Sequence, residues 1–294
     1  MRCLLIGASG QLGRALFSVF APDHKVIPTA HRHPQPGSLA LDLADAGQTQ
    51  AILTETRPDL ILVAGAMCAV DRCELEPEPC RRINVLGPRA VAEYAHEHGS
   101  FVVYYSTDHV FDGTHDVYRE TDAIAPLNAY ARSKAEGETA VRELVPERHL
   151  VLRTSWLYGP DAQRMNFPLR CLDRIRAGER VLVPSDQWGS PTYTEDLAHV
   201  TRFLVDRGYS GTFHATGPDF VDRASLARKI CARFGLDHRY LVPKPTSELG
   251  QAARRPLRVR LDCRKLREAG AGAFRSIDAG LDALGALEPT LLNR

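Results

Sequence analysis

Tyr130 and Lys134 are two residues whose types and spacing could move a proton to or from a carbonyl oxygen. A phenol can act as a proton donor when a nearby cation lowers its pKa from about 10. The surrounding stretch, 128–144, has the pattern of a helix, in which side chains four residues apart share a face. The spacing therefore predicts an ammonium group held near a phenol, an arrangement suited to the reduction of a ketone.

A hydroxyl group close to this pair would help to hold the same carbonyl oxygen. Ser106 and Thr107 follow an apolar stretch, Phe101–Tyr105, that predicts a buried strand. A hydroxyl at the C-terminal end of that strand can bind the carbonyl and share the proton of the phenol. Either Thr107 or Ser106 is thus the expected third member of the group.

A second tyrosine–lysine pair with the same spacing, Tyr240 and Lys244, competes with the first. Pro243 lies between them, and proline removes a backbone donor and disfavours helix at the residue before it. The two side chains therefore need not share a face, and we expect Tyr130 rather than Tyr240 to be the proton donor.

Three glycines spaced three residues apart, Gly7, Gly10 and Gly13, lie where the first predicted strand meets the first predicted helix. Such a turn lets backbone N–H groups approach a pyrophosphate, while the helix N-terminus faces its negative charge. This position is typical of a dinucleotide site. The expected cofactor contacts in the turn are Gly7, Ser9, Gly10, Gln11, Leu12 and Gly13.

The end of the second predicted strand, Lys25–Thr29, indicates which dinucleotide is bound. A site for NAD usually has an acidic residue there, whereas a site for NADP has a cation. Here Arg32 stands between two histidines and can donate two hydrogen bonds to a 2′-phosphate. Asp42 and Leu43 close the third predicted strand, where an acid could accept a hydrogen bond from adenine. We therefore expect NADPH, with use of NADH left open.

The elements that would position these residues alternate between strand and helix through the first half of the chain. Asp59–Ala64 is almost wholly apolar, as in a strand buried on both faces. This alternation predicts right-handed βαβ units and hence an α/β fold, a Rossmann-type doubly wound parallel sheet. Further strands are expected at Arg2–Ile6, Leu39–Asp42 and Leu150–Thr154, and helices at Leu12–Phe20, Gln48–Thr56, Pro88–His98 and Asn128–Leu144.

The alternation loosens after about Tyr158. We therefore expect a Rossmann domain over 1–158 and a smaller, mixed substrate-binding region over 159–294, with some helices returning to the first domain. The smaller region should pack across the end of the sheet, where ligands bind in open α/β folds. Helices are expected at Phe167–Ala177, Thr194–Arg207 and Arg223–Phe234, and a loop rich in Gly, Pro and Ser at Pro184–Thr192. A segment rich in Pro and Arg, Val242–Pro256, follows the last of these helices.

Composition and charge narrow the class of protein. The 294 residues carry 37 Lys and Arg against 36 Asp and Glu, a net charge of +1, so no excess of charge would attract nucleic acid or a membrane surface. No apolar run reaches the roughly 20 residues of a transmembrane helix, and polar residues interrupt the apolar start where a signal peptide would continue. A cytoplasmic protein is expected. The seven cysteines lack the spacing of a zinc site, and no metal is expected.

Together these features resemble the extended short-chain dehydrogenase/reductase family, and most closely its dTDP-4-dehydrorhamnose reductases. The likeness extends over most of the chain. It rests on Gly7–Gly13, Ala69-Val70-Asp71 with Glu74 and Pro77, Ile83-Asn84, Tyr105–Thr114, Pro126–Lys134 with Gly137-Glu138, Arg153–Tyr158, Asn166-Phe167, Asp186–Thr192, Arg255-Pro256, and Leu261-Asp262 with Lys265-Leu266.

The resemblance implies NADPH-dependent reduction of the 4-keto group of a nucleotide-linked 6-deoxyhexose, such as dTDP-4-dehydrorhamnose to dTDP-rhamnose. It implies that Thr107 polarises the keto oxygen, that Tyr130 protonates it, and that Lys134 tunes Tyr130 and holds the nicotinamide ribose. Assembly as a homodimer is left open. The other implied cofactor contacts are Ala64, Gly65, Ala66 and Tyr105, and the implied substrate contacts are Cys68, Val70, Asp108, His109, Trp156 and Asn166.

Some residues depart from the family's usual pattern. Val63, Met67 and Cys68 stand for an Asn, a Tyr and a Thr, and His109 stands for the Tyr that follows Ser-Thr-Asp. Because three of these residues lie where substrate is expected, the identity of the sugar is left open. Arg14 follows the third glycine, where some members have a carboxylate that helps to bind Mg²⁺ between subunits, and this argues against such a site.

Other functions on the same scaffold are alternatives. A 4,6-dehydratase has Asp-Glu after the catalytic Thr, whereas here Asp108 is followed by His109, and a 4-epimerase with tightly held NAD suits Arg32 poorly. A non-catalytic NADP-binding regulatory subunit like that of methionine adenosyltransferase shares the motifs, as does a dihydrostreptose-type synthase of an antibiotic pathway. Trp156 and Asp186–Gly189 favour an enzyme over the regulatory subunit.

Overall fold

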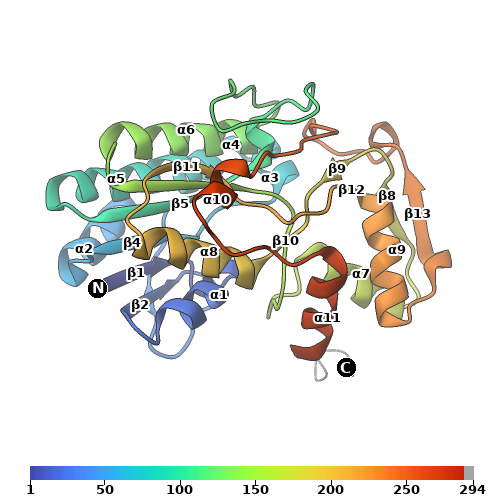
Figure 1. The fold of residues 1–294 in the computed structure, drawn as a ribbon, viewed down its shortest axis with the longest axis horizontal. Helices are drawn as coiled ribbons and strands as arrows, with labels where there is room; N and C mark the ends of the chain where they lie inside the picture. The colour runs from blue at the N-terminus through green and yellow to red at the C-terminus, as the bar shows by residue number, and fades with distance from the viewer. Residues whose placement is uncertain (288–294) are drawn as a thin grey trace.

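Parallel strands form the central sheet of a computed structural model, which describes residues 1–287 (Figure 1). Within this described part the sheet has seven strands in the order β11-β6-β5-β4-β1-β2-β3. The chain runs outward from β1 to β3 and then crosses back to β4 on the other side of β1, so the sheet is doubly wound and the predicted fold class is confirmed. The strands are β1 (Arg2–Ile6), β2 (Lys25–Ala30), β3 (Leu39–Ala40), β4 (Leu60–Val63), β5 (Phe101–Thr107), β6 (His149–Thr154) and β11 (Gly211–His214).

Alternating side chains of the strands bury both faces of the sheet. In β4, Leu60 and Leu62 pack in one apolar cluster with helices α1 and α8, whereas Ile61 and Val63 pack in another with α2, α5 and α6. All of β4 is buried, as expected for a parallel strand covered on both faces. The helices are α1 (Gln11–Phe20), α2 (Ala46–Thr56), α5 (Gly87–His98), α6 (Ala129–Leu144) and α8 (Thr194–Asp206).

The second half of the chain contributes both a strand and a helix to this domain. β11 pairs in parallel with β6, from Gly211 opposite Leu150 to His214 opposite Arg153. Helix α8 lies against α1 in the same apolar cluster. Residues after 158 are therefore shared between the sheet domain and the smaller region.

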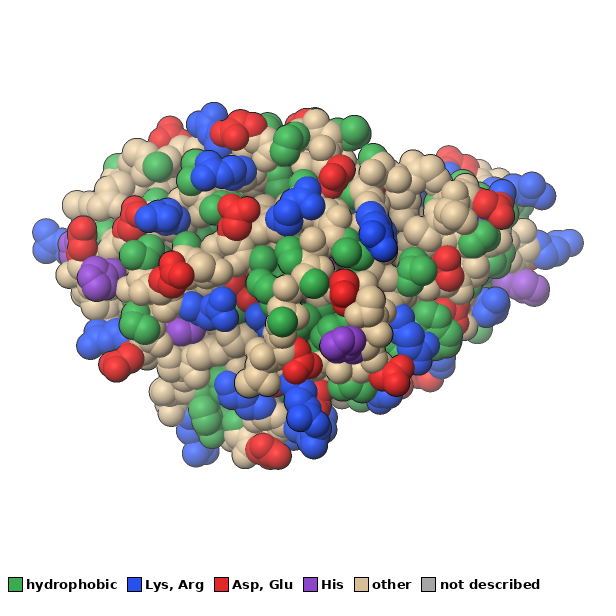
Figure 2. Space-filling model, turned by 90° about the horizontal axis from the view of Figure 1, so that it is seen from above, with side chains coloured by type: hydrophobic (Ala, Val, Ile, Leu, Met, Phe, Trp, Pro, Cys, Tyr) green, Lys and Arg blue, Asp and Glu red, His purple; other side chains and the backbone are tan. Residues whose placement is uncertain are grey.

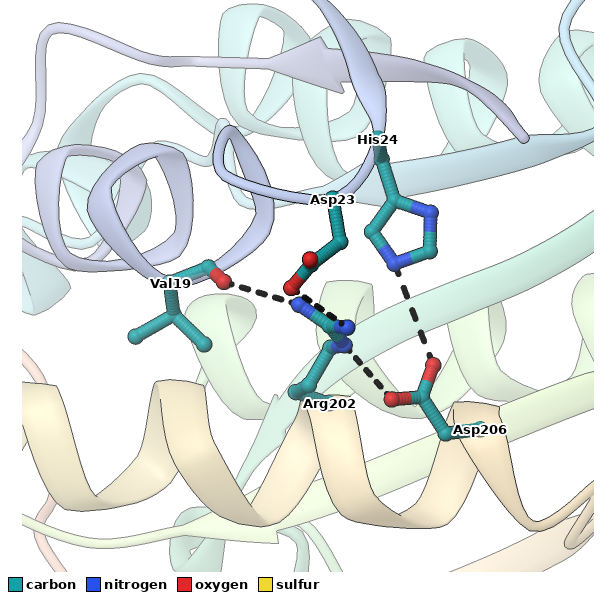
Figure 3. A network of polar contacts seen from close by, with 5 residues as sticks. All are labelled: Val19, Asp23, His24, Arg202 and Asp206. Atoms are coloured by element: carbon teal, nitrogen blue, oxygen red, sulfur yellow. Dashed lines mark hydrogen bonds and ion pairs between the residues drawn. The ribbon is translucent and has the colours of Figure 1, made fainter.

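Arg202 of α8 forms hydrogen bonds and ion pairs with residues at the end of α1 and just after it (Figure 3). Its guanidinium donates hydrogen bonds to the Val19 carbonyl and to Asp23, each at 3.0 Å, and to Asp206 at 2.6 Å. Asp206 also lies 3.8 Å from Nε2 of His24. This network holds α8 beside α1, in the apolar cluster that covers one face of the sheet.

The remaining elements build a smaller region beside the sheet, on the right of Figure 1. Its apolar core includes Leu169, Val183, Ile230 and Leu281. Residues 288–294, the end of the predicted second region, lie outside the described residues. The elements are α7 (Phe167–Arg176), α9 (Arg223–Phe234), α11 (Ile277–Leu287), β7 (Leu157–Tyr158) paired with β10 (Thr192–Tyr193), β8 (Val181–Pro184) with β13 (Leu241–Lys244), and β9 (Trp188–Gly189) with β12 (Val221–Asp222). The short helix α10 (Arg264–Glu268) returns to the sheet domain, where Leu266 joins the same apolar cluster as α1 and α8.

Two segments for which no strand was expected, one of them predicted to be a loop, contain strands. Pro184–Thr192 includes β9, and Val242–Pro256 includes most of β13. Both strands pair with partners far away in the sequence, so the local pattern does not reveal them. The stretch after β4, for which no element was expected, forms α3 (Val70–Leu75), α4 (Pro77–Arg81) and a π-helical turn (Arg82–Leu86).

The surface carries both signs of charge. On the face in Figure 2, basic and acidic side chains are interspersed rather than gathered by sign, in keeping with a net charge of +1. Within residues 1–287, no helix has both the length and the apolar character to cross a membrane. In the same part of the chain, no cluster of three or more His, Cys, Asp or Glu side chains is placed to hold a metal ion.

Candidate active site

A cleft of about 600 Å³ lies at the C-terminal edge of the sheet, beside the crossover between β1 and β4. Parallel strands all end at this edge, so residues that follow β1, β4, β5 and β6 meet there. A cavity of about 280 Å³ shares lining residues with the cleft at the glycine turn, and we call it the glycine-turn cavity. Another, of about 640 Å³, shares lining residues on the side of the smaller region, and we call it the outer cavity.

The glycine turn separates the cleft from the glycine-turn cavity. Gly7 follows β1 with a φ of 84°, and a Cβ at this position would lie 2.7 Å from the backbone of Gly65, so glycine is required. Helix α1 begins at Gln11 without a side-chain cap, which leaves its first N–H groups for an anion. Arg32 is exposed at the rim of the glycine-turn cavity and Asp42 lines it too.

Tyr130 and Lys134 both line the cleft from the start of α6, and both side chains are buried. The Lys134 ammonium lies 3.9 Å from the centre of the Tyr104 ring, and within residues 1–287 no carboxylate is at ion-pair distance from it. Burial lowers the pKa of Lys134 to about 8. Burial raises the pKa of Tyr130 well above its usual value, so in the chain alone burial outweighs the lowering expected from the ammonium. The phenol is therefore protonated, as a proton donor must be.

Contacts at the N-terminus of α6 and in its middle fix the helix in place. Asn128 caps the helix with its side chain, and Glu74 of α3 accepts a hydrogen bond from the Ala129 N–H at 2.7 Å. Arg153 of β6 pairs with Glu138 of α6 at 2.8 Å, with both side chains almost fully buried. Removing one partner of such a buried pair leaves an uncompensated charge, so this bridge holds the helix and the strand in one relative position.

Thr107, the last residue of β5, is the hydroxyl next to Tyr130. It donates a hydrogen bond to Asp108 at 3.1 Å, and Ser155 donates to the other oxygen of the same carboxylate at 2.6 Å. Ser106 also lines the cleft, but its Oγ is buried with no hydrogen-bond partner among the described residues. Of the two hydroxyls that the spacing left open, Thr107 is the one that makes a hydrogen bond with Tyr130.

His109 stands edge-on to Tyr130, with ring centres 5.9 Å apart. It lines both the cleft and the outer cavity. Burial lowers the pKa of His109, which keeps the ring neutral at pH 7, and its Nδ1 is buried with no partner among the described residues.

A network that sequence reasoning missed holds the loop after β4 against α6. Asn84, in the π-helical turn, accepts a hydrogen bond from the Met67 N–H at 2.9 Å and donates to the Met67 carbonyl at 3.0 Å. It also donates to Ser133 at 3.0 Å, and Ser133 donates to the Tyr130 carbonyl at 2.7 Å. The network places Cys68, the next residue of the loop, in the lining of the cleft. π-Helical turns recur at functional sites, but no local sequence pattern announces this one.

Trp156 is held in the opposite wall of the cleft by an unusual backbone conformation. Its φ is 43°, a region that bulky residues rarely adopt and that costs about 1–3 kcal/mol. A Cβ on Gly189 would lie 2.5 Å from the indole ring, so only glycine lets β9 pass beneath it. On the ring rests the guanidinium of Arg223, 3.4 Å from the ring centre. Arg223 lies 67 residues after Trp156 in the chain, at the start of a predicted helix, and no local sequence pattern links the two residues.

The predicted site residues all line the cleft or the glycine-turn cavity. Two of these residues, Tyr105 and Asn166, use their polar groups in hydrogen bonds within the protein. The Tyr105 hydroxyl turns away to donate a hydrogen bond to Thr201 of α8 at 3.1 Å. Asn166 caps α7 and donates to the Gly159 carbonyl at 2.9 Å. The cleft is lined by Gly10, Gln11, Leu12, Gly13, Ala64, Ala66, Cys68, Val70, Tyr105, Thr107, Asp108, His109, Tyr130, Lys134, Trp156 and Asn166, and the glycine-turn cavity by Gly7, Ser9, Arg32, Asp42, Leu43 and Gly65.

A family model described as the RmlD substrate binding domain matches residues 1–286. The chain belongs to this family. Among RmlD-like relatives, a protein of Escherichia coli named dTDP-4-dehydrorhamnose reductase is 36% identical over 91% of this chain and 91% of its own length. One of Streptomyces niveus named dTDP-4-keto-6-deoxy-D-glucose reductase is 34% identical over 92% of this chain and 91% of its own.

A solved structure of the same kind is that of dTDP-4-dehydrorhamnose reductase from Bacillus anthracis in complex with NADP. It superposes with a TM-score of 0.88 at 31% identity and covers 97% of this chain and 99% of that one. Membership of the RmlD family confirms the resemblance predicted from the sequence and the oxidoreductase class. The NADP of the Bacillus anthracis structure agrees with the cofactor predicted from Arg32.

Proposed function

We propose that this chain reduces the 4-keto group of a dTDP-linked 4-dehydro-6-deoxyhexose with NADPH. The observation that carries the proposal is the group of Tyr130, Lys134 and Thr107 at the sheet edge, between the glycine-turn cavity and the outer cavity. The names of the Escherichia coli and Streptomyces niveus relatives support a dTDP-linked keto sugar as the substrate class.

Two features of the structure fit NADPH. The buried Lys134 ammonium has no carboxylate partner within residues 1–287 and is free to donate hydrogen bonds to ribose hydroxyls. The uncapped start of α1 suits the pyrophosphate, and Arg32 at the rim of the glycine-turn cavity suits the 2′-phosphate. When bound, NADPH supplies the hydride that reaches C4 of the sugar.

The protein's own residues then provide the proton. Thr107 turns its hydroxyl from Asp108 toward the keto oxygen, while Ser155 continues to hold the carboxylate. As the C=O bond becomes a C–O bond, the protonated Tyr130 gives its proton to the oxygen, and the product is an alcohol. The Lys134 ammonium stabilises the phenolate that is left. Tyr130 regains its proton from solvent before the next turnover.

The opposite wall selects the substrate. Trp156 lines the cleft as an apolar wall for the sugar, and His109 and Cys68 line both the cleft and the outer cavity. The outer cavity has room for a nucleoside. We favour a reductase over a non-catalytic NADP-binding subunit because the Escherichia coli and Streptomyces niveus relatives are named reductases. A Xenopus tropicalis relative named methionine adenosyltransferase 2 subunit beta is 32% identical over 92% of this chain, so turnover decides between the two functions.

The direct test is turnover. The protein is incubated with NADPH and the 4-keto product of a dTDP-glucose 4,6-dehydratase, NADPH oxidation is followed by absorbance, and the sugar is identified by NMR. We expect one NADPH oxidised per sugar reduced, and deuterium at C4 when deuterated NADPH is used. Absence of NADPH oxidation with any nucleotide-linked 4-keto sugar, together with co-purification with a synthetase, would contradict the proposal.

A further inference from the structure

Arg223 places a positive charge in the wall between the cleft and the outer cavity, and it lines both. It is the first residue of α9, and its guanidinium lies 3.4 Å from the ring centre of Trp156 and 4.7 Å from that of Phe167. Stacking on aromatic rings uses the flat faces of a guanidinium. The N–H groups at its edge are left to donate hydrogen bonds.

No group of the described chain neutralises this charge at short range. Within residues 1–287, no carboxylate lies at ion-pair distance from the Arg223 guanidinium and no side chain accepts a hydrogen bond from it. Asp108 acts on it through space, but that carboxylate is held by Thr107 and Ser155. The N–H groups of the Arg223 guanidinium therefore have no side-chain acceptor within residues 1–287.

The surroundings also make the charge costly to keep. Burial lowers the pKa of Arg223 to about 9, and the like charge of Arg170 lowers it further. Arg223 also opens α9, and cations are disfavoured at a helix N-terminus. Arg223 is half-buried and lines a cleft, and a perturbed charge in such a place is a candidate for ligand binding.

We propose that Arg223 binds the diphosphate of the nucleotide-linked substrate through the edge of its guanidinium. The proposal rests on the proposed function, in which the sugar reacts in the cleft beside Tyr130 and the nucleoside lies in the outer cavity. The diphosphate joins sugar to nucleoside, so it must cross the boundary between the two, where Arg223 stands. Arg170, which lines the outer cavity, adds a second positive charge.

The chemistry of the guanidinium favours phosphate over other anions. Its planar fork matches two phosphoryl oxygens at once, and such charge-assisted pairs are roughly twice as strong as neutral hydrogen bonds. Because Arg223 also stacks on Trp156, binding of the diphosphate by Arg223 would also fix the indole that lines the cleft. One side chain thus couples recognition of the nucleotide to the shape of the sugar pocket.

The test compares a ligand with the diphosphate and one without it. Binding of dTDP and of thymidine is measured by calorimetry for wild-type protein with NADP⁺ bound, and for R223Q, R223K and R258Q. We expect R223Q to weaken dTDP binding by about tenfold to a hundredfold and to leave thymidine binding unchanged. R223K keeps the positive charge but not the planar fork of the guanidinium, so its affinity for dTDP should lie between those of the wild-type protein and R223Q.

R258Q is the matched control, because Arg258 also stacks on two aromatic rings, Trp188 at 4.9 Å and Phe220 at 5.1 Å, but does not line the cleft or the outer cavity. NADPH affinity of each variant reports that the sheet domain is folded. If R223Q and R223K bound dTDP as tightly as the wild-type protein does, this inference would be overturned and the proposed function would stand. Failure of the wild type both to bind dTDP and to reduce a keto sugar would overturn the proposed function and this inference together.

Discussion

The wall of the cleft that faces the expected cofactor and the wall that faces the expected substrate depend on different kinds of contact. The first is made of strand ends and the glycine turn, where backbone geometry sets the shape, as the φ of Gly7 and its contact with Gly65 show. The second is made of side chains from distant segments, Trp156, Phe167 and Arg223, stacked on one another. Its backbone is strained at Trp156.

This difference means that the two walls can be altered separately. A substitution in the cofactor wall should change nicotinamide binding or the chemical step without disturbing the indole of Trp156. A substitution under Trp156 should change substrate binding without reaching Lys134 or the glycine turn. Independent effects are expected for sites that share no contacts.

Lys134→Met should have the largest effect of the variants that probe the cofactor wall. Loss of the ammonium removes the charge that stabilises the phenolate, and kcat should fall by about a hundredfold or more. The melting temperature should not fall, because Lys134 is a buried cation with no carboxylate partner within residues 1–287. Steady-state kinetics and thermal melting measure the two quantities.

Lys244→Met is the matched control for this change. Lys244 belongs to the other tyrosine–lysine pair, and its ammonium bonds to Glu248 at 2.9 Å on the surface. Its kcat should equal that of wild type. Comparable losses in the two variants would mean that the position of Lys134 in the cleft is not what matters.

Arg32→Gln should act on the same wall at the 2′-phosphate. Loss of charge-assisted hydrogen bonds should raise KM for NADPH by roughly tenfold to a hundredfold. KM for NADH, which lacks the phosphate, and KM for the keto sugar should stay unchanged. If KM for both nucleotides rose equally, Arg32 would have a role other than phosphate recognition.

Gly189→Ala should have a smaller effect, confined to the substrate wall. The added methyl would lie 2.5 Å from the Trp156 ring and must displace it, so we expect KM for the keto sugar to rise about tenfold. Gly272→Ala, where nothing lies within 4 Å of the added methyl, is the control. A change in NADPH affinity in the Gly189 variant would show that the walls are not independent.

The cofactor wall could be predicted from the sequence because its signals are local. The glycine spacing, the apolar strand before it and the cation after the second strand all lie within the first 32 residues. Tyr130 and Lys134 are one helical turn apart, so their shared face follows from spacing alone. Spacing alone did not choose between Thr107 and Ser106, because both follow the same strand, and only the family resemblance pointed to Thr107.

The substrate wall was harder to predict from the sequence, because its contacts join residues far apart in the chain. Trp156 was expected only through a family resemblance, and Arg223 was not expected at all. Asn166 was assigned to substrate, yet its amide is used to cap α7 and bind the Gly159 carbonyl. The strands β9 and β13 were missed for the same reason, since each is defined by a distant partner.

The central claim is that Tyr130 supplies the proton, and single-turnover kinetics of Tyr130→Phe tests it most directly. With saturating keto sugar and NADPH bound, NADPH oxidation should slow by about a hundredfold or more, while the Kd for NADPH stays at the wild-type value. Tyr240→Phe should react at the wild-type rate. A Tyr130→Phe rate close to that of wild type would contradict the assignment of Tyr130 as the proton donor.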